Sequence, residues 1–244
     1  MDSSSTPFSG APGRFSDSGQ RIGTDLFTAL RLACAIFLAW LLVISAGQVA
    51  HGQELLQTTG DAANTTLMVN DAGDAADADT ADGLCDADLV MPDLQCTLRA
   101  AIQEANAQPG LDTINFDLPA DSLTIRPVSP LPQISEAAIV DASTEPGPEE
   151  GNAQPEAACT TPTVQIDGAL TGAGADGLVV SSGGSTVRGL IITRFPDAGI
   201  LLISGAGNTI TCNLIGTDAA GTAGLGNGAN GIDIFQSDGN VIGG

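Results

Sequence analysis

The sequence of 244 residues contains no lysine, and its single histidine is His51. All seven basic residues are arginines, which face 29 Asp and Glu residues and leave a formal net charge of −22. A surface this acidic repels phosphate backbones, so we expect no nucleic-acid partner. It equally disfavours unaided binding of polyanionic sugars. Acidity of this kind is typical of proteins that stay soluble in a salty or extracellular setting.

The N-terminal apolar run is shorter than the roughly 20 residues that span a bilayer. This run, Leu32–Gly47, has 16 residues and follows a polar start that carries three arginines. We predict that residues 1–52 are a signal peptide, with a small-residue cleavage site at 50–52 or at 45–47. An uncleaved N-terminal anchor is the alternative, and it would be the route by which the chain contacts a membrane.

Four cysteines follow the predicted signal peptide: Cys85, Cys96, Cys159 and Cys212. An even number of cysteines in an exported chain favours disulfides over a metal site. We expect a disulfide between Cys85 and Cys96, because the short acidic loop between them has no other anchor. Cys159 and Cys212 would form the second disulfide, and a buried free thiol at Cys212 is the alternative.

The last third of the chain repeats one short pattern of β-branched runs separated by Gly, Asn and Asp corners. Gly177, Gly199 and Gly231 are equivalent positions, at intervals of 22 and 32 residues. Asn208 and Asn240 fall at a shared corner, where stacked side chains would form a turn ladder and bind buried amides. The pattern predicts a mainly β fold, a right-handed parallel β-helix of the pectate-lyase-like solenoid type. A β-sandwich with glycine-rich turns is the alternative.

An amphipathic helix is predicted over residues 96–106. Its apolar stripe repeats at helical spacing, Thr97 provides an N-cap, and Arg99 and Glu104 are expected to point away from the stripe. One helix of this length is unstable alone, so we expect it to cap the open end of the β-helix. The stripe consists of Leu98, Ala101, Ile102 and Ala105.

The acidic loop 71–83 precedes this helix and is a candidate for calcium, which takes six to eight oxygen ligands. Its spacing does not match an EF-hand, so a solvated loop without a cofactor is the preferred interpretation. The predicted organisation is therefore a signal peptide or anchor (1–52), a capping region (53–111) and a parallel β-helix (112–244) that looks truncated at its C-terminus. Short strands are expected near 65–70, 113–116, 123–126, 138–141 and 163–167, and a surface loop over 144–159.

The segment Cys85–Asn106, with Cys-Thr-Leu-Arg-Ala-Ala-Ile-Gln-Glu-Ala-Asn at its end, resembles the bacterial CSLREA-type N-terminal domain. In that family a Cys-Ser-Leu-Arg-Glu-Ala-Ile-x-x-Ala-Asn helix follows a strand and an Asp-rich loop. This chain departs from the pattern at Thr97 and Ala100. Phrases such as Val187-Arg-Gly-Leu-Ile-Ile are similar to the right-handed β-helix that follows this domain in secreted and cell-surface proteins. The resemblance implies export and a surface role, and it implies no reaction.

Enzymes on a β-helix scaffold are the alternative class. With no histidine after His51, a histidine-activated nucleophile is excluded from the remaining chain. A lyase needs an Arg or Lys base beside bound calcium, and Arg126, Arg188 and Arg194 have no carboxylate cluster alongside in sequence. A glycoside hydrolase needs two carboxylates about 5 to 10 Å apart, for which Asp218 and Asp233 are the candidates.

We therefore expect an exported structural or adhesive protein of the bacterial cell surface, with no catalytic residues in this segment. Its expected partners are extracellular glycans or other cell-surface components.

Overall fold

The computed structural model describes residues 64–80, 82–88, 90, 94–145, 159 and 161–243. Thr59–Gly244 form one compact unit, in which the described part is mainly β with one α-helix and two short 3-10 helices. No helix in these ranges has the length and apolarity needed to cross a membrane. The predicted signal peptide or anchor and most of the predicted loop 144–159 lie outside the described residues.

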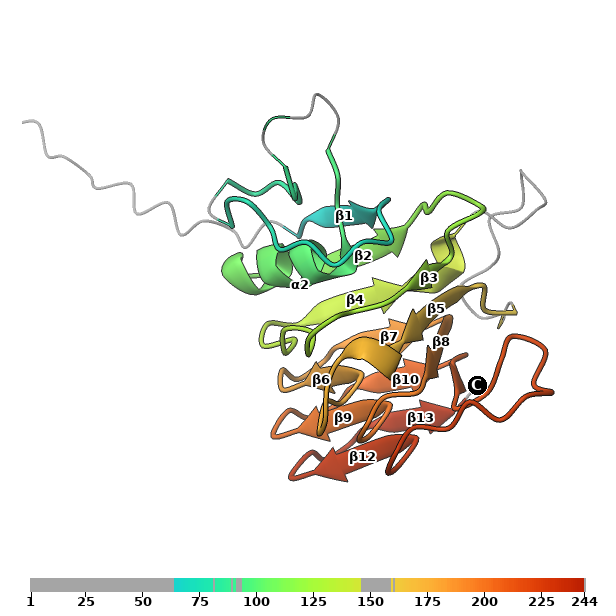
Figure 1. The fold of residues 1–244 in the computed structure, drawn as a ribbon. Coiled ribbons are helices and arrows are strands. Elements are labelled where there is room, and N and C mark those ends of the chain that lie inside the picture. Colours follow the sequence, from blue (N-terminus) through green and yellow to red (C-terminus); the bar gives the residue numbers. More distant parts are fainter. Residues whose placement is uncertain are drawn as a thin grey trace, which may run out of the picture. The chain divides into compact units, whose positions relative to one another are not determined.

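The strands form three separate sheets, and within each sheet all neighbouring strands are parallel (Figure 1). The first sheet contains β1 (Thr66–Val69), β2 (Asp112–Phe116), β4 (Ala138–Asp141), β7 (Thr186–Arg188), β10 (Thr209–Thr211) and β13 (Val241–Gly243). The second contains β3 (Thr124–Ile125), β5 (Val164–Asp167), β8 (Leu190–Thr193) and β11 (Leu214–Ile215). The third contains β6 (Leu178–Val180), β9 (Ile200–Ile203) and β12 (Ile232–Phe235).

The chain visits the three sheets in a fixed order, and we call one such passage a rung. The second, third and fourth rungs are residues 138–180, 186–203 and 209–235, and β13 begins another. The first rung, 112–134, joins the third sheet through a single bridge between Ile134 and Val180. Each rung lies in register on the one before it. Equivalent residues of consecutive rungs therefore stack directly on one another.

The core lies between the three sheets and is filled by inward side chains of each rung. Val140, Val187 and Ile210 stack in the first sheet, and all three are buried. Parallel strands that are covered on their inner face carry this kind of Val, Ile and Leu sequence. The second and third sheets contribute Ile166, Ile192, Leu178, Ile200, Val180 and Leu202, which are also buried.

The predicted glycine repeat is confirmed as a column of close backbone contacts. Gly177, Gly199 and Gly231 each precede the strands β6, β9 and β12, whose first residues lie in register. A Cβ atom added at Gly177 would lie 2.2 Å from the carbonyl oxygen of Gly199, and one at Gly199 would lie 2.7 Å from that of Gly231. Only glycine permits such close stacking of consecutive rungs.

The predicted helix is confirmed as α2 (Leu98–Ala107), which packs on β1 and β2 at the first-rung end of the stack (Figure 1). The Thr97 side chain accepts a hydrogen bond from the Ala100 N–H, as expected for an N-cap. The apolar stripe of α2 is buried. Glu104, which is predicted to point away from this stripe, is buried as well, and the stripe pattern gave no indication of that burial.

Candidate functional site

All four arginines of the described residues form ion pairs with aspartates. Arg188 pairs with Asp141, and the two residues face each other in register on β7 and β4. Arg194 and Arg126 both pair with the buried carboxylate of Asp167 at the end of β5. Asp141 and Asp167 also cap the 3-10 helices that follow β4 and β5. The arginines thus tie neighbouring parts of the stack together.

The electrostatics of Asp141 illustrate the strength of this arrangement. Burial by itself would raise the pKa of the Asp141 carboxyl. Hydrogen bonds from Arg188 and Ser143, together with the Arg188 charge, outweigh burial and hold the pKa below its usual value. Asp141 is therefore ionised and pairs with Arg188 at neutral pH.

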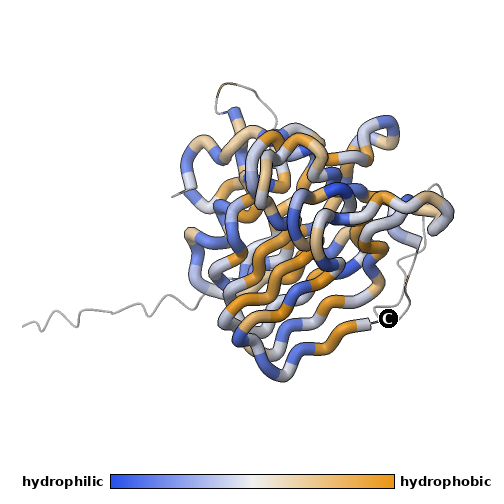
Figure 2. The backbone as a smooth tube through the Cα atoms, turned by 60° about the horizontal axis from the view of Figure 1, so that its bottom comes forward, coloured by the Kyte–Doolittle hydropathy of each residue, from blue (hydrophilic) through white to orange (hydrophobic). Residues whose placement is uncertain are grey.

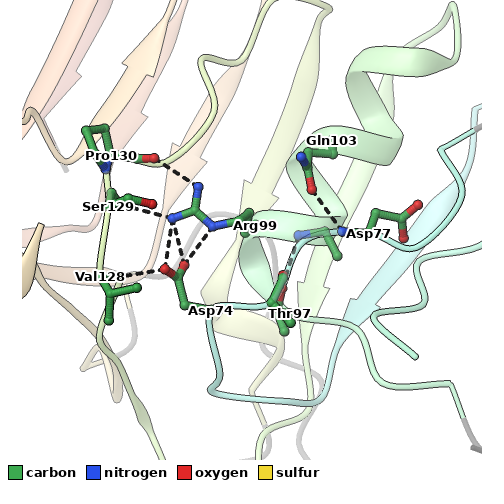
Figure 3. Close-up of polar contacts among 10 residues, drawn as sticks. Asp74, Asp77, Thr97, Arg99, Gln103, Val128, Ser129 and Pro130 are labelled. Atoms are coloured by element: carbon green, nitrogen blue, oxygen red, sulfur yellow. Dashed lines mark hydrogen bonds and ion pairs between the residues drawn. The ribbon is translucent and has the colours of Figure 1, made fainter.

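A fourth ion pair lies within the capping region, and its two side chains also bind the backbone of the first rung (Figure 3). Arg99 donates from Nε and Nη2 to the two carboxylate oxygens of Asp74, at 2.9 Å each. Asp74 also accepts the Val128 N–H at 2.8 Å, and Arg99 donates to the carbonyl oxygens of Ser129 and Pro130. The side chains of Arg99 and Asp74 are only 12% and 10% exposed. The sequence predicts only that Arg99 points away from the apolar stripe, and the structure shows that its side chain is largely buried among these polar partners.

Three other carboxylates of the acidic loop bind the backbone of the same region. Asp71 accepts the Gly73 N–H, Asp82 accepts the Leu84 N–H, and Asp77 accepts the Asp86 N–H. Among the described residues, no group of three or more His, Cys, Asp or Glu side chains lies close enough to hold a metal ion. The loop acts as a structured element in which carboxylates replace missing backbone partners.

Glu104 is the second feature of the cap that the sequence pattern missed. Its carboxylate is buried on α2, and burial raises its pKa, as do the negative charges of Asp77 and Asp82. Oε2 of Glu104 and Oδ2 of Asp77 are buried acceptors without a hydrogen-bond donor in the described structure. No sequence signal marks this burial, because Glu at this helical position is ordinarily exposed.

The structure contains both disulfides that the sequence suggests. Cys85 and Cys96 are buried and joined beside the start of α2, with Cα atoms 5.1 Å apart. Cys159 is joined to Cys212, which follows β10, also with a Cα separation of 5.1 Å. In this structure Cys212 is therefore not a free thiol.

The asparagine corner forms a ladder of side-chain to backbone hydrogen bonds along the stack. Oδ1 of Asn240 accepts the Asn208 N–H, and Oδ1 of Asn208 accepts the Ser185 N–H, both at 2.9 Å. Oγ of Ser185 in turn accepts the Ala138 N–H at 3.1 Å. Three consecutive corners thus supply acceptors to the amides of the rung before, which is a structural role.

The two carboxylates proposed for a glycoside hydrolase have different surroundings. Asp218 is exposed and turns its carboxylate onto its own loop, where it accepts hydrogen bonds from Ala223 and Thr222 that lower its pKa. Asp233 lies exposed on β12, in register with Leu201. The charge of Asp233 instead contributes to the raised pKa of Asp176.

Asp176 precedes β6 and accepts the Ala198 N–H at 2.9 Å. Burial raises the pKa of Asp176, and the charges of Asp197 and Asp233 raise it further. The spacing of Asp218 and Asp233 in sequence gave no indication of this interaction, because Asp176 lies two rungs earlier.

Comparison with protein-family models, with curated proteins and with solved structures finds no match to this chain.

Proposed function

We propose that this chain is an exported structural or adhesive protein of the bacterial cell surface, without catalytic activity in this segment. We further propose that it folds as a right-handed parallel β-helix with a CSLREA-type cap. The order in which each rung visits three parallel sheets supports the β-helix. The right hand follows from the strong preference of connections between parallel strands.

The main support for a structural role is that every arginine of the described residues forms an ion pair with an aspartate. The side chains of Arg99 and Arg188 are largely buried, whereas those of Arg126 and Arg194 are 56% and 44% exposed. Three of the four bind carboxylates at the ends of β4 and β5. A lyase would need one such side chain facing the substrate as a base. The asparagine ladder and the glycine column account for further polar and small residues as parts of the stack.

Export is supported by the two disulfides, since such bonds persist in oxidising compartments and are rare in the cytosol. The acidic composition fits the same setting. The partners we propose are neutral glycans or other surface components, because the net charge of −22 repels polyanions unless calcium bridges the two.

A glycoside hydrolase is the second candidate, and Asp176 is the observation that favours it. The raised pKa of Asp176, to which burial and the charges of Asp197 and Asp233 contribute, is a property expected of a general acid. Here Asp176 would be the acid and Asp233 its partner. The backbone hydrogen bond to Asp176 Oδ1 also fits a purely structural carboxylate, and we prefer that interpretation.

The deciding experiment assays the exported chain on pectate, alginate and neutral glucans with millimolar calcium, following unsaturated products and reducing ends. We expect no turnover. Reproducible turnover that is lost in Asp176→Asn or Asp233→Asn, and retained in the loop variant Asp218→Asn, would establish the hydrolase instead. Turnover lost only in Asp218→Asn would identify a different site and equally overturn the structural proposal.

Adhesion and a purely structural role are separated by binding. Pull-down on the same glycans and on whole cells, with and without calcium, tests for a ligand. Saturable binding without turnover identifies an adhesin. Absence of binding to all of them leaves a rigid stalk as the function.

A further inference from the structure

Two arginine side chains converge on one carboxylate at the corner between the second and third sheets. Nε of Arg126 lies 3.3 Å from Oδ2 of Asp167, and Nη2 of Arg194 pairs with the same oxygen. Nε of Arg194 also donates to Oδ1 of Asp167 at 2.8 Å. The three residues belong to consecutive rungs, because they lie at the ends of β3, β5 and β8, which are neighbours in the second sheet. Two positive charges therefore share a single negative charge.

This corner carries one positive charge more than it neutralises. Neither arginine pairs with a second carboxylate among the described residues. The Asp167 side chain is enclosed, whereas both guanidinium groups reach solvent. Because two like charges repel each other, the excess charge favours the approach of an anion. The corner is thus a local positive site on a chain whose net charge is −22.

Arg126 has the geometry to bind a second carboxylate. Its contact with Asp167 uses Nε, so its terminal nitrogens Nη1 and Nη2 have no partner among the described residues. A guanidinium presents these two nitrogens as a planar fork that matches the two oxygens of a carboxylate. The contact with Asp167 also restrains the guanidinium before a ligand arrives, which lowers the entropy cost of binding.

The surface beside the two arginines contains uncharged polar groups. Gln165 lies two residues before Asp167 and therefore on the same face of β5. Its Nε2 donates to Oγ1 of Thr193 at 2.8 Å. Hydrophilic residues gather at the corners between strands, while the strands themselves are largely apolar (Figure 2). Amide and hydroxyl groups of this kind can pair with the hydroxyl groups of a sugar.

The net charge of the chain limits what can carry the carboxylate. An acidic peptide or a polyanionic chain would bring further negative charges against a surface with a net charge of −22. A sugar with one carboxylate in an otherwise neutral glycan matches the single excess charge and adds no more. The charge therefore favours an isolated acidic sugar.

We propose that Arg126 and Arg194 form a binding site for the carboxylate of an isolated uronic acid residue in an otherwise neutral glycan. The terminal nitrogens of Arg126 bind the carboxylate, Arg194 adds its positive charge, and Asp167 holds both guanidinium groups in place. The inference rests on the adhesive form of the proposed function, because it specifies the chemistry of the glycan. Arginine stays protonated in proteins, so the site binds a sugar and supplies no base.

Isothermal titration calorimetry on the full exported chain tests the ligand. The probes are a xylo-oligosaccharide that carries one glucuronic acid, the same oligosaccharide without it, and the methyl ester of the acidic form. We expect saturable binding of the acidic oligosaccharide, at least tenfold tighter than binding of the two uncharged probes and weaker as salt is added. Equal affinity for the three probes, or no binding of the acidic one, would overturn the proposal.

Arg126→Gln tests the site itself. The Arg126 side chain is 56% exposed, so its replacement should cost little stability, and we expect at least a tenfold loss of affinity for the acidic oligosaccharide. Asn230→Asp is the matched control, because Asn230 is exposed at another corner and both changes make the net charge one unit more negative. We expect Asn230→Asp to bind within twofold of the unaltered chain. Unchanged affinity in Arg126→Gln, or equal losses in both variants, would overturn the site.

Failure of this site and failure of the proposed function give different results. If the preference for the acidic sugar is absent while neutral glucans or whole cells still bind in the pull-down, the site is wrong and the adhesive function stands. Turnover of any glycan would overturn the proposed function whether or not the acidic sugar binds. A peptide with a single glutamate that binds as tightly as the acidic oligosaccharide would overturn the assignment of a sugar.

Discussion

The N–H group of Asn208 donates to Oδ1 of Asn240 at 2.9 Å, although the two residues are 32 positions apart. Asn208 is completely buried. Its own Oδ1 accepts a hydrogen bond from the Ser185 N–H, so the same contact repeats one rung earlier. A buried amide without an acceptor costs free energy comparable to a lost hydrogen bond. The asparagine therefore stabilises the corner of the rung before its own.

Replacing Asn208 by alanine should lower the free energy of unfolding by about 1 to 3 kcal/mol, because the Ser185 N–H loses its acceptor in a buried corner. Urea unfolding followed by circular dichroism measures this difference. Asn230→Ala is the control, since the Asn230 side chain is exposed at another corner, and a change within about 0.5 kcal/mol is expected. Equal losses in the two variants would contradict the ladder.

Removing either partner of the Arg99–Asp74 pair should destabilise the chain by about 3 kcal/mol, because each leaves a largely buried charge without its partner. The Arg99→Ala and Asp74→Ala double variant should lose much less than the sum of the single losses. Arg126→Ala is the matched control. Its side chain is 56% exposed, so we expect a loss below about 1 kcal/mol. Additive losses in the double variant would show that the two side chains act independently.

The disulfide between Cys85 and Cys96 should be present in exported protein and should contribute about 2 to 3 kcal/mol to stability in the chain-entropy model. Peptide mapping without reductant should recover the two cysteines linked. Thermal unfolding of the Cys85→Ala, Cys96→Ala double variant measures the contribution. Two free thiols in oxidised, exported material would disprove the pairing.

Glu104→Gln should raise the thermal midpoint at pH 7 and leave it unchanged near pH 4. Burial raises the pKa of Glu104 above its ordinary value of 4.5, so the folded state favours the protonated carboxyl. The stability from this group is fully present below pH 4.5 and is lost as the pH rises through the raised pKa. The glutamine variant has no charge to bury, and the difference from the unaltered chain should grow across that window.

Asp141→Asn tests the opposite case, a carboxyl whose pKa is lowered in the folded state. Hydrogen bonds from Arg188 and Ser143 lower the pKa of Asp141 despite its burial, so its stabilising effect is present above pH 3.8 and is lost as the pH falls. We expect Asp141→Asn to lower the thermal midpoint at pH 7.

For Glu104→Gln, a change in thermal midpoint that does not vary with pH would contradict the assignment of a raised pKa to Glu104.

The sequence by itself determined the elements that repeat or have a local signature. The glycine column, the asparagine corner and the apolar stripe of α2 are all visible as periodic residue types, and the strands lie near the expected positions. The apolar stripe follows the helical period of about 3.6 residues, and the glycine column and asparagine corner are visible because they recur once per rung. The Cys85–Cys96 pairing belongs with them, since its partners are close in sequence.

Only the tertiary structure decided which charged residues meet. Arg188 reaches Asp141 across 47 positions, Arg194 reaches Asp167 across 27, and Arg99 reaches Asp74 across 25. These separations follow from the unequal lengths of the loops between strands, which set the residue that stacks on each position. Loop lengths carry no periodic signal, so the ion pairs and the burial of Glu104 are decided by how the rungs and the cap pack against one another.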